Sequence, residues 1–164
     1  MLYHSNRVGS VVSCSATTLV DATPKTIVEA HVLERNASKF RDVQKYSKFS
    51  VGADGIIDVE FPAKIAFFPF TQKFCKRATA NRIDFWTPAD SLAQIRGKWS
   101  FKRFHGKTLV EFEQIAKVPG WATIFPLESY IRSRVTRMMQ DTAALPASPA
   151  VLAEDANRIK TEPL

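Results

Sequence analysis

The sequence predicts an α+β domain in which one long helix near the C-terminus covers an antiparallel sheet. Residues 126–145 repeat apolar side chains with the period of an α-helix. Residues 46–113 carry strand-type alternation and turn signals, with no long helix among them. The chain has 164 residues, 45% of them hydrophobic and 24% charged, which is ordinary for one soluble domain with a substantial core.

The first third of the chain predicts a tail, a strand and two short helices. Residues 1–9 are interpreted as an N-terminal tail, and residues 11–20 are rich in Val, Thr and Ser, which favour a strand. Thr23 suits the N-cap of a helix whose first residue is Pro24, because a proline there loses no helical hydrogen bond. Ser38 suits the N-cap of a second short helix.

The sheet region begins with a hairpin and continues through a Phe-rich stretch. The Asp-Gly pair at 54–55 is a strong hairpin signal. Pro62 indicates an edge or an irregularity, since proline cannot donate to a strand ladder. Residues 65–74 look extended but irregular, because Pro69 interrupts the expected strand, and residues 74–86 form a further strand.

Residues 92–104 and 109–118 predict a long antiparallel hairpin. The first strand alternates between an apolar face and a basic face, which is typical of a sheet with one dry and one wet side. Its dry face holds Ile95, Gly97, Trp99 and Phe101. On the wet face, Glu111 and Glu113 are expected to balance cross-strand Lys98 or Arg103.

The long helix has one residue that breaks its pattern. Pro126 suits its first position, and the helix is expected to end near Leu145, before two prolines. Arg134 lies in the middle of the apolar face, where a bare buried charge would be very costly. Two interpretations stay open. In one, the apolar stem of Arg134 packs against its neighbours while the guanidinium reaches solvent; in the other, the guanidinium meets a polar group inside a cavity.

A single helix cannot fill the concavity of a strongly curved sheet, so a pocket with an aromatic lining is expected between them. The alternative is that the rings form a solid core. The candidate ligand contacts are Phe68, Phe70, Phe74, Arg77, Phe85, Trp99, Phe101, Phe112, Tyr130, Ile131, Arg134 and Met138.

Motifs for metal or nucleophilic chemistry are missing from the sequence. The three histidines are far apart, and Cys14 and Cys75 have no metal-ligand spacing, so we predict no metal and no cofactor. Free thiols in a reducing compartment are the simplest interpretation, with one disulfide as the alternative. No phosphate loop and no nucleophile elbow is found, and no catalytic residue is assigned.

The formal net charge of +7 is partly local. Residues 73–107 carry nine basic against two acidic residues. This indicates either a solvated basic surface or an electrostatic contact with phospholipid or RNA.

Several stretches resemble the START and birch-pollen-allergen-like superfamily of helix-grip proteins. They are VSCSATTLVDATPKTIV, KFRDVQKYSKFSV, SLAQIRGKWSFKRFHGKTLVEFEQI and the Pro126-Leu127 pair that opens the last helix. The resemblance covers residues 11–145, and FFPFTQKFCKR is most similar to the coenzyme-Q-binding and polyketide-cyclase-like branch. It implies about seven antiparallel strands that grip the C-terminal helix around a hydrophobic cavity, with two short helices after the first strand. It implies no universal catalytic residues.

The expected organisation is one START-like ligand-binding domain at residues 10–145, with residues 146–164 as a C-terminal tail that is mobile or a short helix. The favoured function is binding or transport of a lipid, quinone, sterol or polyketide-like molecule, without catalysis. One alternative is a cyclase- or dehydratase-like enzyme that uses the same cavity. The other is a protein- or RNA-interaction module that uses the basic sheet surface.

The expected partner is a hydrophobic small molecule, with an anionic membrane surface as a transient contact and nucleic acid not favoured. The opening residues lack a secretory pattern, so a cytoplasmic location is expected. The sequence does not set the oligomeric state.

Overall fold

A computed structural model describes residues 1–33, 47–65 and 68–146. In this part of the chain, eight strands form one antiparallel sheet, accompanied by two α-helices and one 3₁₀ helix. The elements are β1 (Leu2–Val8), β2 (Val11–Val20), α1 (Pro24–Val32), β3 (Lys48–Val51), β4 (Ile57–Ile65), β5 (Phe68–Ala78), β6 (Arg82–Trp86), β7 (Gln94–Phe104), β8 (Lys107–Lys117), η2 (Gly120–Ile124) and α2 (Leu127–Ala143).

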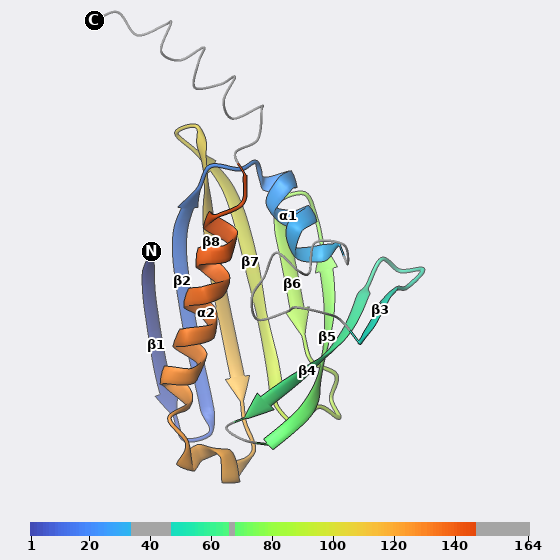
Figure 1. Cartoon of the computed structure of the whole chain (residues 1–164), viewed down its shortest axis with the longest axis vertical. Coiled ribbons are helices and arrows are strands. Elements are labelled where there is room, and N and C mark those ends of the chain that lie inside the picture. The colour runs from blue at the N-terminus through green and yellow to red at the C-terminus, as the bar shows by residue number, and fades with distance from the viewer. Residues whose placement is uncertain (34–46, 66–67, 147–164) are drawn as a thin grey trace, which may run out of the picture.

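The sheet is curved and α2 lies along it (Figure 1). The strand order is β1-β2-β8-β7-β6-β5-β4-β3, so β1 and β3 form the edges. Helix α2 packs against β2 and β1, and α1 approaches β5 and β7. The predicted α+β fold, a curved antiparallel sheet around a long C-terminal helix, is confirmed.

The predicted N-terminal tail is wrong, because Leu2–Val8 forms the edge strand β1. This strand pairs with β2 from Leu2↔Thr17 to Val8↔Val11, and Gly9 turns the chain with φ +59°. Most side chains of β1 are exposed, so its sequence lacks the apolar alternation that marks a half-buried strand. The sheet therefore has eight strands where about seven were expected.

The helix ends follow the predicted signals closely. Thr23 caps α1, since its Oγ1 accepts a hydrogen bond from the backbone N–H of Thr26 at 3.2 Å. Pro126 stands at the N-cap of α2 rather than at its first helical residue, and α2 ends at Ala143 rather than near Leu145. The predicted second short helix and nearly all of the C-terminal tail lie outside the described residues.

Neither proline of the β4–β5 pair breaks its strand, contrary to the prediction for Pro69. Pro62 pairs with Thr71, beyond the last β4 residue that pairs with β3. Pro69 pairs with Lys64, before β5 begins to pair with β6. Each proline thus stands where its strand is paired on one side only, which is the position that tolerates a missing N–H.

The predicted β7–β8 hairpin is confirmed. His105 and Gly106 form its turn with φ values of 47° and 77°. Trp99 and Phe101 of β7 are buried, while Lys98 and Lys102 form 3.0 Å ion pairs with Glu113 and Glu111 on β8. The alternation read from the sequence therefore matches the two faces of the sheet.

Gly97 on β7 gives an aromatic ring room to lie across the sheet. Its register partners are Phe85 on β6 and Gln114 on β8. The Phe85 ring stacks on Phe112 of β8, two strands away, with centroids 5.8 Å apart and planes 7° apart. A Cβ at position 97 would overlap the Phe85 ring and the backbone oxygen of Glu113. The missing side chain therefore permits this stack.

We expect Gly97→Ala to lower the free energy of unfolding by about 2 kcal/mol, because the added methyl displaces the Phe85 ring or the backbone of β8. Gly120→Ala is the matched control, since a Cβ there meets nothing within 4 Å. Urea unfolding of both variants measures the difference. Equal stability of the two variants would show that the space above Gly97 is not needed.

Candidate ligand cavity

A cavity of about 210 Å³ lies between α2 and the concave face of the sheet. Its walls come from α1, α2 and strands β4 to β8. Most of its lining is carbon, supplied by aromatic and aliphatic side chains. The expected pocket is therefore present, and the alternative of a solid core is excluded for the described residues.

Nine of the twelve candidate ligand contacts line this cavity, and their role in binding stays a prediction. They are Phe70, Phe74, Phe85, Trp99, Phe112, Tyr130, Ile131, Arg134 and Met138.

Two other candidates lie elsewhere. Phe101 is buried in the core beside Trp99 and does not line the cavity. Arg77 is exposed on the outer face of β5, because it follows Lys76, which lines the cavity, and successive strand residues face opposite sides. Its register partner on β6 is Asp84. The side chain of Phe68 lies outside the described part of the chain.

The aromatic side chains form a connected wall. Phe74 contacts Phe61 and Phe85, with ring centroids 6.0 and 5.9 Å apart. The stack of Phe85 on Phe112 continues the wall, and Trp99 lies 4.7 Å from Phe112. Offset and edge-on ring pairs of this kind stabilise one another beyond their burial, so the wall holds its shape without filling the space in front of it.

Arg134 combines the two interpretations that the sequence left open. It is half-buried and lines the cavity from the second turn of α2. Its Nη1 donates a 3.1 Å hydrogen bond to the hydroxyl of Tyr130, and its guanidinium lies 5.8 Å from the centre of that ring. Tyr130 is exposed, so Arg134 stands where the cavity wall meets solvent.

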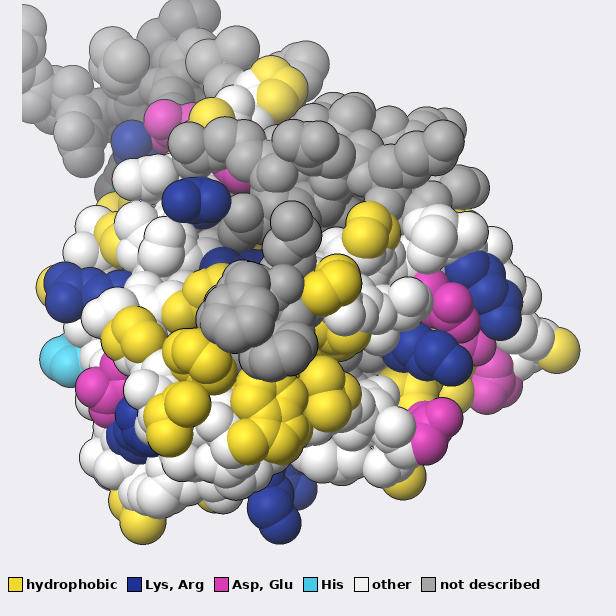
Figure 2. Space-filling view, turned by 60° about the horizontal axis from the view of Figure 1, so that its bottom comes forward, with side chains coloured by type: hydrophobic (Ala, Val, Ile, Leu, Met, Phe, Trp, Pro, Cys, Tyr) yellow, Lys and Arg dark blue, Asp and Glu magenta, His cyan; other side chains and the backbone are white. Residues whose placement is uncertain are grey.

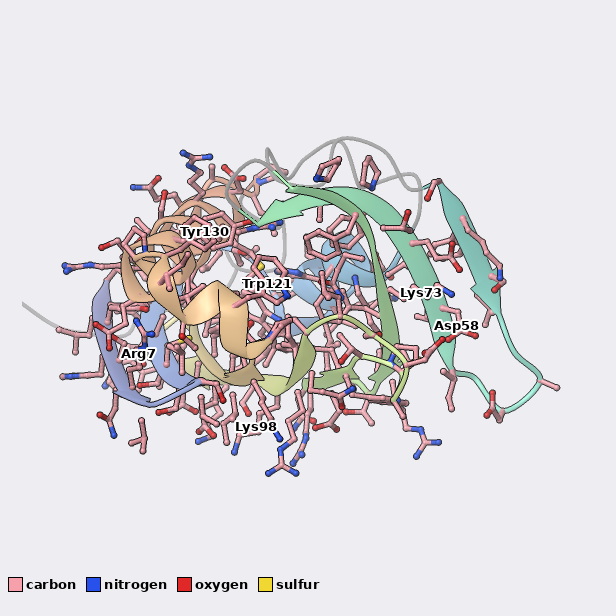
Figure 3. The ribbon with its side chains drawn as sticks, turned by 90° about the horizontal axis from the view of Figure 1, so that it is seen from below. Arg7, Asp58, Lys73, Lys98, Trp121 and Tyr130 are labelled. Carbon is pink, nitrogen blue, oxygen red and sulfur yellow. The ribbon has the colours of Figure 1, made fainter. Side chains whose placement is uncertain are left out.

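The lower end of the molecule, where α2 begins, exposes apolar side chains. Trp121 and Ile124 on η2 are 44% and 81% exposed, and Tyr130 is exposed in the first turn of α2. Figure 2 shows hydrophobic side chains gathered over the middle of this end, with Lys and Arg side chains around them. Figure 3, viewed from below, shows Trp121 nearer the middle of this end and Tyr130 on the α2 side. Among the described residues, neither helix is long and apolar enough to cross a bilayer.

A polar group lies in the cavity wall where α1 meets β5 and the last turn of α2. His31 Nε2 and Thr142 Oγ1 are 3.0 Å apart, and the Thr142 hydroxyl donates to the carbonyl of Met138 at 2.8 Å. Since that hydroxyl has a single proton, His31 donates through Nε2–H, which fixes its neutral tautomer. Lys76 Nζ donates a 3.1 Å hydrogen bond to the carbonyl of His31.

Burial changes the protonation of this pair. Desolvation, and then the charge of Lys76, lowers the pKa of His31 to about 3, so the imidazole is neutral at pH 7. Desolvation lowers the pKa of Lys76 to about 8. The lysine therefore remains mostly cationic at pH 7 although it lines an apolar cavity.

Sequence reasoning missed five polar lining residues: His31, Gln72, Lys76, Gln114 and Asp141. A signal for two of them exists in β5, where Phe70, Gln72, Phe74 and Lys76 alternate onto one face. That signal is readable only once the limits of β5 are known. Nothing in the sequence pattern marks His31 or Asp141, because α1 and α2 bring them to the cavity through tertiary packing.

The two cysteines are free, as the sequence predicted. Burial raises the pKa of both Cys14 and Cys75 to about 11, so neither is a thiolate at neutral pH. Among the described residues, no group of three His, Cys, Asp or Glu side chains is placed to hold a metal ion.

No protein-family model matches the sequence, and no curated protein matches it either. Solved structures do match the fold. TTHA0849 from Thermus thermophilus is 16% identical with a TM-score of 0.64, covering 87% of this chain and 98% of that one. The Zhui aromatase/cyclase from Streptomyces sp. R1128 is 13% identical with a TM-score of 0.64, covering 92% and 97%.

A third structure is StfQ, the di-domain aromatase/cyclase of the steffimycin biosynthetic pathway. It is 12% identical with a TM-score of 0.66, covering 91% of this chain. The chain spans about half of StfQ, 53% of its length. The chain thus has the helix-grip fold, and the resemblance to the START and birch-pollen-allergen-like superfamily is confirmed at the level of fold.

We expect the stability of the protein to fall as the pH drops below 6.5, partly because of His31. Its pKa is about 3 when folded and near 6.5 when unfolded, so between these values the unfolded chain binds the extra proton and is favoured. The predicted contribution approaches about 1 kcal/mol per pH unit. Urea unfolding at several pH values should show a steeper loss for the wild type than for His31→Gln, whose amide can still donate to Thr142. Parallel pH profiles would contradict a buried neutral His31.

Proposed function

We propose that the protein binds a hydrophobic small molecule in the cavity between α2 and the sheet. The observation that supports this most is the combination of an open cavity with an aromatic wall and few polar groups. Small-molecule sites have this composition, because apolar area supplies affinity while a few polar groups orient the ligand. Phe74, Phe85, Trp99 and Phe112 would contact the apolar body of the ligand.

The size of the cavity favours a compact ligand. Its volume of about 210 Å³ lies below the range of about 300–1,000 Å³ that is usual for drug-sized sites. A quinone head group, a small fused-ring molecule or a single acyl chain suits this space better than a lipid with two chains. Lipids, sterols, quinones and polyketides are the classes that the sequence resemblance implies, and the volume favours the smaller members.

The fold neighbours support a small-molecule site, although their likeness is one of fold. Zhui and StfQ are named as aromatase/cyclases, and both match more than nine-tenths of this chain. An enzyme of this type is the second candidate function, favoured by the polar side chains that reach the cavity, Lys76 and Arg134 among them. Mass spectrometry of molecules extracted from the wild type and from cavity variants separates the two. A carrier yields the same molecule from the wild type and from the cavity variants. An enzyme yields product from the wild type and unconverted substrate from the variants.

The basic outer surface gives less support to an RNA-binding function. Lys98, Lys102 and Arg82 form ion pairs with Glu113, Glu111 and Asp84, and Lys107 pairs with Asp21. Glu113, Glu111 and Asp21, which lie outside residues 73–107, thus balance part of the local excess. The exposed apolar end supports the predicted transient contact with an anionic membrane surface, which stays a prediction.

The neutral probe N-phenyl-1-naphthylamine should bind the wild-type protein with a rise in fluorescence, because the cavity is apolar. Ala116→Phe should weaken this binding by about tenfold or more, since Ala116 lines the cavity and its new ring would occupy it. Ile115→Phe is the matched control, because Ile115 is the preceding residue and is exposed on the outer face. Organic extraction followed by mass spectrometry should recover a bound apolar molecule from the wild type.

An empty protein that also ignores the probe would overturn the proposal. Equal effects of Ala116→Phe and Ile115→Phe would place the probe outside the cavity. Circular dichroism of both variants confirms that the sheet is intact before binding is compared.

A further inference from the structure

The described lining of the cavity carries a net positive charge despite its apolar character. Within residues 1–33, 47–65 and 68–146, the charged lining side chains are Lys76, Arg134 and Asp141, two cations against one carboxylate. His31 adds no charge at pH 7, because burial and the neighbouring Lys76 hold its pKa far below neutral. A ligand that fills this space is therefore accommodated better with an anionic group than with a cationic or purely apolar end.

Lys76 is the cation most enclosed by the cavity wall. It stands on β5 with Ile57 and Phe85 as its register partners on the neighbouring strands, so apolar side chains flank it on both sides. Its Nζ donates to the carbonyl of His31 at 3.1 Å, which holds the ammonium at the α1 side of the cavity. A charge-assisted hydrogen bond from an ammonium in such surroundings is stronger than one in water.

Arg134 is less suited to anchor a buried group. Its guanidinium contacts the hydroxyl and the ring of the exposed Tyr130, at the side of the cavity that meets solvent. Solvent screens a charge there and weakens its attraction for a ligand anion. The two cations thus differ in how strongly each would select an anionic group.

We propose that Lys76 binds an anionic oxygen group, such as a carboxylate, at one end of a compact apolar ligand. This inference rests on the proposed function, since it names the class of ligand for the same cavity. The aromatic wall would hold the apolar body while Lys76 fixes its orientation. The ligand class is then a small amphipathic acid rather than a neutral hydrocarbon.

Decanoate and decanol provide a matched pair of probes, because they share a compact apolar chain and differ in the charged end. Each is measured by displacement of N-phenyl-1-naphthylamine from the wild type, Lys76→Met, Arg77→Met and Arg134→Met. Arg77→Met is the matched control, because it removes the same charge one residue away on the outer face of β5.

The proposal expects decanoate to bind the wild type more tightly than decanol at pH 7. Lys76→Met should weaken decanoate by about tenfold or more, the size expected for one charge-assisted hydrogen bond, and leave decanol and the neutral probe nearly unchanged. Lys76→Arg should retain much of the preference for decanoate. Arg77→Met should have no effect on either probe, and Arg134→Met a smaller effect than Lys76→Met.

Three results would overturn the inference while the proposed function survives. They are equal binding of decanoate and decanol to the wild type, equal weakening of both by Lys76→Met, and a loss of decanoate that follows Arg134→Met instead. The first uses only wild-type protein, so it decides the matter even if Lys76→Met fails to fold. Failure of the neutral probe to bind the wild type would instead remove the proposed function itself.

Discussion

The concave face of the sheet is wider than the single long helix that lies on it. Eight strands spaced about 4.8 Å apart extend over about 34 Å, whereas a helix with its side chains is about 10–12 Å across. Helix α2 packs on β2 and β1, so it covers one side of the concave face, while only the short helix α1 among the described helices is seen to approach β5 and β7. Because α2 is narrower than the concave face, a cavity remains beside the strands that it does not cover. The aromatic residues cluster on those strands.

The aromatic wall keeps this space open instead of filling it. A ring that stands upright on the sheet would extend toward α2, but the Phe85 ring lies over Gly97 of the neighbouring strand and stacks on Phe112. Gly97 makes this possible, because any side chain between the two rings would lift Phe85 off β7. The rings gain contact area from one another, which stabilises the concave face of the sheet beside the cavity.

The sequence could predict the elements whose side chains alternate between a dry and a wet face, and it failed where register or tertiary packing decides. The β7–β8 hairpin was predictable, since Trp99 and Phe101 alternate with lysines and a tight turn follows. Strand β1 was not, because an edge strand exposed on most positions has no apolar period. The sequence analysis predicted Arg77 as a ligand contact, whereas the neighbouring Lys76 lines the cavity. An error of one residue along β5 thus moves a side chain from the cavity to the outer face of the sheet. His31 could not be predicted, since its role depends on Thr142, more than a hundred residues away.

The same reasoning explains why the fold alone does not determine the ligand. Structures at 11–16% identity share the sheet and its helix with this chain, so the arrangement that creates a cavity persists while most side chains change. Aromatic and aliphatic residues can replace one another in the wall and still leave an apolar space of similar shape. A charged side chain in that wall is different, because its desolvation costs free energy in every folded molecule and only a complementary group recovers that cost. Lys76 stays mostly cationic at neutral pH although it lines this wall, so we expect the few polar positions of the wall, more than its carbon surface, to decide which ligand this cavity prefers.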